Sequence, residues 1–181
     1  MTPVAELPAA DQLQRLPLRA IVAYAYRSAS RVAVALHQDI PSDIVSNALG
    51  FAERFVAERD IRLVDAADAL LAAACVAKAS EISGSPLIAR ASLSVTSATE
   101  SASLAILAAF SDPKNSRGYQ AQAAIKAARS ARLVDALEEP AAAVALLACL
   151  RDFRCFVDVF GEYDTFMFGE PFDPSEIAGV A

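Results

Sequence analysis

Alanine constrains this chain more than any other feature. It accounts for 41 of the 181 residues, against six glycines and no tryptophan. Alanine is the best helix former, and its small side chain lets two helix backbones approach closely. Hydrophobic residues make up 55% of the chain, which is enough to build an apolar core. We therefore expect an all-α protein, a single-domain antiparallel helical bundle of about six main helices joined by short loops.

The spacing of apolar residues predicts where these helices lie. The clearest helix covers residues 17–38, and the others are expected over 42–59, 64–83, 86–110, 119–137 and 140–160. Ser42 or Asp43 is expected to be the N-cap of the second helix, and Gly84 is expected to follow the end of the third. Three sets of apolar or small residues are expected to face the core: Leu18, Val22, Ala25, Ala29, Val32 and Leu36 in the first helix; Leu63, Ala67, Leu70, Ala74 and Ala77 in the third; Val144, Leu147, Leu150, Phe153, Val157 and Phe160 in the last.

Residues 92–103 are unusually rich in serine and threonine. Their alternation from Ser92 to Ser97 is compatible with a short strand. Flanking alanines and leucines favour a helix with a small-residue face, which could break near residues 94–97. Both readings are open on the sequence alone.

Three regions follow from this pattern. Residues 1–16 form an N-terminal lead-in that has room for a short helix over 9–16, and residues 17–160 form the helical bundle. Residues 161–181 contain three glycines and two prolines and are expected to be an irregular acidic-aromatic C-terminal tail. That tail is expected to pack on the bundle or on a partner.

The residues that usually carry chemistry are scarce. His37 is the single histidine, the three cysteines (Cys75, Cys149 and Cys155) have no CxxC spacing, and no nucleotide-binding or nucleophile-elbow motif is present. We therefore predict no catalytic residue, no metal ligand and no cofactor. The cysteines are expected to be reduced and mostly buried, as in a cytoplasmic protein. The longest apolar runs, 69–77 and 141–150, are about half of the roughly 20 residues that a membrane span needs, so no membrane partner is expected.

Charge is distributed unevenly, although the net charge is only −6. No acid lies between Asp112 and Asp135, where the predicted fifth helix carries Lys126, Arg129 and Arg132. No base follows Arg154, whereas six acids do, interleaved with aromatic side chains. The candidate partner-binding residues are Lys126, Arg129, Arg132, Tyr163, Phe166, Phe168 and Phe172.

The basic segment has three possible roles. It is a solvated helix face, or it docks an acidic segment of this chain or of a partner, or it binds nucleic acid. The last is disfavoured because the body of the chain is formally neutral and only Tyr119 is near for base stacking.

Two stretches carry a resemblance. Residues 16–24, continuing to 30–32, and the acidic ending Gly169-Glu170-Pro171-Phe172-Asp173-Pro174-Ser175-Glu176 are similar to alanine-rich small all-helical proteins of planctomycete type. The two stretches cover about a sixth of the chain. The resemblance implies an all-helical cytoplasmic protein and supplies no activity.

The sequence thus favours a non-enzymatic protein–protein interaction or adaptor module, whose partner is another protein or a second copy in a homodimer. The alternative is a helical bundle that binds an apolar small molecule. The many alanines favour close helix contact over an open pocket.

Overall fold

The structure is a computed structural model that describes residues 7–58, 60–110 and 139–160, together with residues 122, 125, 126 and 129. The described residues contain helices and no strand, which confirms the all-α prediction. The elements are α1 (Ala10–Leu13), α2 (Leu18–Ala33), the 3₁₀ helix η1 (Val34–Gln38), α3 (Ser42–Ala57), α4 (Val64–Ser83), α5 (Pro86–Phe110) and α7 (Glu139–Phe160).

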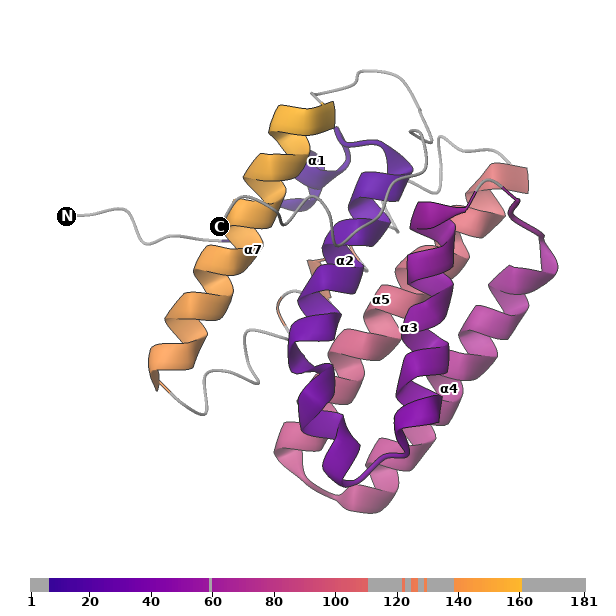
Figure 1. The fold of residues 1–181 in the computed structure, drawn as a ribbon, viewed down its shortest axis with the longest axis vertical. Helices are drawn as coiled ribbons and strands as arrows, with labels where there is room; N and C mark the ends of the chain where they lie inside the picture. The colour runs from indigo at the N-terminus through magenta and orange to yellow at the C-terminus, as the bar shows by residue number, and fades with distance from the viewer. Residues whose placement is uncertain are drawn as a thin grey trace.

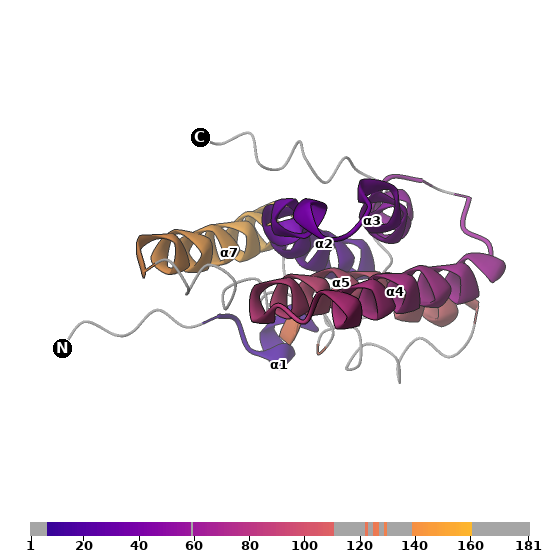
Figure 2. The same ribbon diagram turned by 90° about the horizontal axis from the view of Figure 1, so that it is seen from below.

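The long helices lie in two layers. Figure 1 shows α7, α2, α3 and α4 following one another across the molecule, with α5 behind α2 and α3. Figure 2, seen from below, shows α7, α2 and α3 side by side in one layer and α5 and α4 in the other. Helix α5 packs against α2, α3 and α4, whereas α7 packs on α2. The core therefore lies around α5, and α4 and α7 form two edges of the bundle.

Helix α5 holds its neighbours through small side chains and hydroxyl groups. Two of its serines and one of its threonines donate hydrogen bonds to backbone carbonyls of adjacent helices: Ser103 to Ala66 of α4 at 2.9 Å, Ser92 to Val76 of α4 at 3.4 Å, and Thr99 to Ala48 of α3 at 3.1 Å. A hydroxyl group reaches a neighbouring helix's backbone only where the two helices are close. The Ser/Thr-rich stretch is thus an unbroken helix, and the strand reading is wrong.

Helix α4 turns the opposite face inward from the one that its leucines predicted. Its buried residues are Ala66, Ala69, Ala72, Ala73, Val76 and Ser80. On the predicted core face, Leu63, Ala67, Leu70 and Ala74 are exposed, and Ala77 is half-buried. The small residues face the bundle because close contact with α5 leaves no room for leucine. The predicted apolar residues of α4 do share one face of the helix, but most of that face is exposed.

Most helix boundaries match the sequence. The predicted stripe of α2 is buried along its whole length, and α1 provides the short leading helix. Gly84 follows α4 with a φ of 66°, in the left-handed region that glycine tolerates. The N-cap of α3 is Pro41 and not Ser42 or Asp43, because the helix already begins at Ser42.

The inward face of α7 also differs from the prediction. Its buried residues include Cys149, Asp152 and Phe156, whereas Leu147 is 62% exposed and Leu150, Phe153 and Val157 are half-buried. Val144 and Phe160 lie outside the side chains that the structure describes. The carboxylate of Asp152 explains why α7 turns this face inward, because it contacts Arg27 and Arg31 on α2.

Arg19 joins the start of α2 to the end of α3. Only 4% of this residue is exposed, and its guanidinium group donates hydrogen bonds to the carbonyls of Phe55, Val56 at 3.1 Å and Glu58 at 2.8 Å. The guanidinium carbon also lies 5.3 Å from the centre of the Phe55 ring. The last carbonyls of a helix have no partner within the helix and carry partial negative charge. Arg19 donates hydrogen bonds to these carbonyls, and their partial negative charge compensates the buried positive charge of its guanidinium group.

Helix α5 is long and apolar enough, by length and composition, to cross a membrane, and it is the one such helix among the described residues. In this structure 61% of its apolar 18-residue stretch is buried inside the protein. The same length and composition are found in the central helix of a bundle.

The close contact around α5 can be tested with two alanines of that helix. Ala91 is fully buried and Ala89 is exposed. We expect Ala91→Leu to lower the free energy of unfolding by about 1–3 kcal/mol, because overpacking forces the helices apart. Ala89→Leu should change it by no more than about 0.5 kcal/mol. Urea denaturation of both variants measures the difference, and equal midpoints would contradict the packing described above.

Candidate functional site

The structure describes two of the partner-binding residues predicted from sequence. Lys126 and Arg129 are exposed and helical. Arg132, Tyr163, Phe166, Phe168 and Phe172 lie outside the described residues. Contact between the basic segment and the acidic tail therefore stays a prediction.

The cysteines are more accessible than predicted. None of the three forms a disulfide, and only Cys149 is buried. Cys75 is exposed on α4 and Cys155 is half-buried on α7. Among the described residues, no group of three or more His, Cys, Asp or Glu side chains is placed to hold a metal ion.

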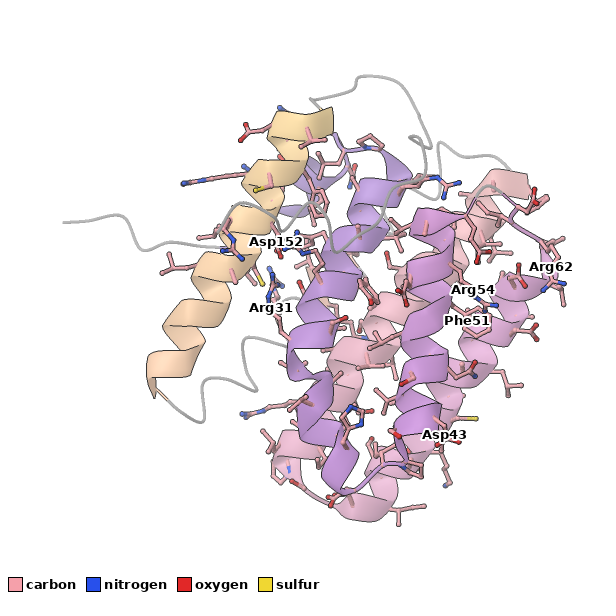
Figure 3. All side chains as sticks on the ribbon, in the orientation of Figure 1. Arg31, Asp43, Phe51, Arg54, Arg62 and Asp152 are labelled. Carbon is pink, nitrogen blue, oxygen red and sulfur yellow. The ribbon has the colours of Figure 1, made fainter. Side chains whose placement is uncertain are left out.

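The most concentrated polar cluster lies between α2 and α7. Arg27 and Arg31, one turn apart on α2, both contact Asp152 of α7. Figure 3 labels Arg31 and Asp152 where these two helices meet. Arg27 Nη2 lies 2.9 Å from Asp152 Oδ1, and Arg31 Nη2 donates to Oδ2. Asp152 is 1% exposed and Arg27 is 9% exposed. One carboxylate thus serves two guanidinium groups inside the interface.

Most of this cluster is buried, although Arg31 is 25% exposed. Arg27 lies over the Phe156 ring at 6.0 Å, and the pKa of Arg27 is lowered because burial disfavours its charged form, an effect that Asp152 opposes. Burial also raises the pKa of Tyr24, so its phenol stays protonated. Ser28 donates to the Tyr24 carbonyl and lies 3.7 Å from Cys149 Sγ. The contacts of Asp152 with both arginines join α7 to α2, so we assign the cluster to holding these two helices together.

The exposed side of α4 presents a different kind of surface. We call it the α4 outer face, defined by Leu63, Val64, Ala67, Leu70, Leu71, Ala74, Cys75, Lys78 and Ile82. Its large side chains are unusually accessible: Leu63 is 52% exposed, Val64 55%, Leu70 48%, Leu71 67% and Ile82 82%. Lys78 is its single charged member. Five large apolar side chains on one helix face are a docking surface rather than scattered exposure.

Two hollows between α3 and α4 continue this face. One, of about 290 Å³, is lined by Asn47, Phe51, Asp68, Leu71, Ala72 and Cys75. The other, of about 180 Å³, is lined by Phe51, Arg54, Phe55, Glu58, Asp60, Ile61, Arg62, Asp65 and Ile106. Phe51 lines both, so the two hollows meet at its ring. Figure 3 shows Phe51, Arg54 and Arg62 gathered at this part of α3 and α4.

Two of the charged groups of the smaller hollow, Arg62 and Asp65, form an ion pair. Arg62 Nη2 lies 2.8 Å from Asp65 Oδ1, and the Arg62 backbone N–H donates to Asp65 Oδ2 at 3.1 Å. The side-chain hydrogen bond lowers the pKa of Asp65 and raises that of Arg62. The Arg54 guanidinium carbon lies 4.5 Å from the centre of the Phe51 ring. These contacts shape a polar border beside an apolar face.

Sequence reasoning missed both features for physical reasons. The α4 outer face was recognised as apolar but assigned to the core, because periodicity does not say which side of an alanine-rich helix faces inward. The Arg27–Arg31–Asp152 cluster had a weak signal, since Asp152 lies within an otherwise apolar row. Its partners are far away in sequence, so only the fold could pair them.

No protein-family model, curated protein or solved structure matches this chain.

The structural role of the buried cluster predicts the effect of removing one charge. Asp152→Asn keeps the size of the side chain but leaves two arginines without a counter-ion, and should destabilise the protein by about 3–5 kcal/mol. The control is Asp158→Asn, an exposed acid on the same helix, which should shift stability by no more than about 0.5 kcal/mol. Thermal and urea unfolding measure both. If the two variants unfold alike, α7 does not depend on this cluster.

Proposed function

We propose that this protein is a non-enzymatic protein-interaction module that binds its partner through the α4 outer face. One observation carries the proposal: Leu63, Val64, Leu70, Leu71 and Ile82 are all about half exposed or more on a single edge helix. Monomeric proteins rarely expose a contiguous apolar patch of this kind unless it is an interaction site.

The surroundings of this face support the proposal. A protein interface has an apolar centre and a polar rim. The centre here is formed by the leucines, and the rim by Asp68, Lys78 and the Arg62–Asp65 pair. The hollow lined by Phe51 and Leu71 offers a pocket for a side chain of the partner. Side chains that fill such pockets contribute most of the binding free energy of an interface.

A small apolar ligand has less support. The hollows of about 180 Å³ and 290 Å³ are smaller than most ligand pockets, which measure about 300–1,000 Å³. The smaller one is lined largely by charged residues. Neither hollow encloses the apolar space that such a ligand needs.

The proposal predicts a loss of binding when a charge enters the α4 outer face. In protein purified from its own host cells, native mass spectrometry should show the chain bound to another protein molecule, of its own kind or of another. Leu71→Glu should abolish that complex, because the buried carboxylate would have to be desolvated. Val159→Glu is the matched control, since Val159 is 61% exposed on α7, and should leave the complex intact. If the parent carries no protein partner, or if Leu71→Glu retains it, the proposal is wrong.

A further inference from the structure

We infer that the partner on the α4 outer face is a second copy of this chain, packed antiparallel so that the two α4 helices are related by a two-fold axis. This inference rests on the proposed function, because it names the occupant of the same surface.

The inference starts from one row of the α4 outer face and its border. The row consists of Val64, Asp68, Leu71, Cys75, Lys78 and Ile82, all exposed. Successive members are separated by four, three, four, three and four residues, a spacing that keeps them on one side of a helix. This spacing is the same when the row is read backward. Any row of alternating four- and three-residue steps has this property, so the spacing permits a two-fold contact and the residue types decide whether it is favourable.

The residue types along the row are also complementary when two copies of the row pack antiparallel. In an antiparallel pair, Val64 meets Ile82 of the second copy, Leu71 meets Cys75, and Asp68 meets Lys78. Each contact occurs twice, so the dimer contains two acid–base pairs and four apolar contacts along this row. A parallel pair would instead place Asp68 against Asp68 and Lys78 against Lys78, and the like charges would repel. The row therefore selects the antiparallel orientation.

Lys78 can reach the second copy at little cost. In the single chain it pairs with Glu81 at 3.3 Å, where the two side chains are 77% and 70% exposed. An exposed pair of this kind contributes little to stability. Lys78 can therefore exchange it for Asp68 of the second copy.

The chain's own acidic tail is the less suitable occupant. The hollows beside the face are lined by the acids Glu58, Asp60, Asp65 and Asp68 and by two bases, Arg54 and Arg62. A segment with six acids and no base would meet this net negative charge. A second copy of α4 brings one base, Lys78, opposite the acid that borders the larger hollow.

A charge exchange tests the orientation and the occupant together. The purified full chain is measured by sedimentation velocity over a concentration series at low salt. The parent should form a dimer. Asp68→Lys should raise its dissociation constant by about tenfold or more, because two like-charge contacts replace two ion pairs. The double variant Asp68→Lys with Lys78→Asp should restore the dimer, since it exchanges the members of each pair.

The controls separate association from folding. Asp158→Lys changes the net charge equally but lies on α7, and it should leave the dimer unchanged. Far-UV circular dichroism should show the same helical content in all variants. Failure of the double variant to recover the dimer would overturn the inference, as would a parent that is monomeric at every concentration.

These results also distinguish this inference from the proposal on which it rests. If the purified chain is monomeric while the complex from host cells is lost in Leu71→Glu, the surface binds a different protein and the second-copy inference is wrong. If no complex of either kind depends on Leu71, both are wrong.

Discussion

Close packing around α5 is the constraint on which the rest of the structure depends. The hydroxyl groups of Ser92, Thr99 and Ser103 reach backbone carbonyls of α3 and α4. Such contacts hold only while the helices stay close together, and alanine on the facing helix permits that distance. These three hydroxyl groups are thus satisfied although they are buried, whereas the buried Ser97 Oγ has no hydrogen-bond partner among the described residues.

The same constraint creates the α4 outer face. Once the alanines of α4 face α5, the leucines on the other side must point outward, because α4 lies at an edge of the bundle. Exposure of Leu71 and Ile82 is therefore a consequence of how the core is packed and not a local irregularity. A surface produced in this way is apolar, rigid and helical. A partner that binds it can bury apolar area without ordering a loop, and so avoids much of the entropy cost of association.

The two edges of the bundle are held by different forces. Helix α4 is attached through small residues and hydroxyl-to-carbonyl hydrogen bonds, whereas α7 is attached to α2 through Asp152 and its two arginines together with Phe156. A buried ion cluster is sensitive to the loss of any one member, because the remaining charges stay desolvated. Arg19 shows the same principle at the end of α3, where backbone carbonyls provide the compensation. Buried charge in this protein thus serves to join helices that are distant in sequence.

The sequence by itself determined the helices and most of their boundaries. Alanine content, the stripe of α2, the proline and glycine signals and the spacing of apolar residues are local properties, and local propensity is sufficient to define a helix of this length. The tertiary structure alone decided which face of α4 and of α7 lies inside. On an alanine-rich helix both faces are apolar enough to be buried, so hydrophobicity does not choose between them. Packing decides which face is buried. The small residues of α4 allow close contact with α5, and Asp152 of α7 pairs with Arg27 and Arg31, which only the folded chain brings together.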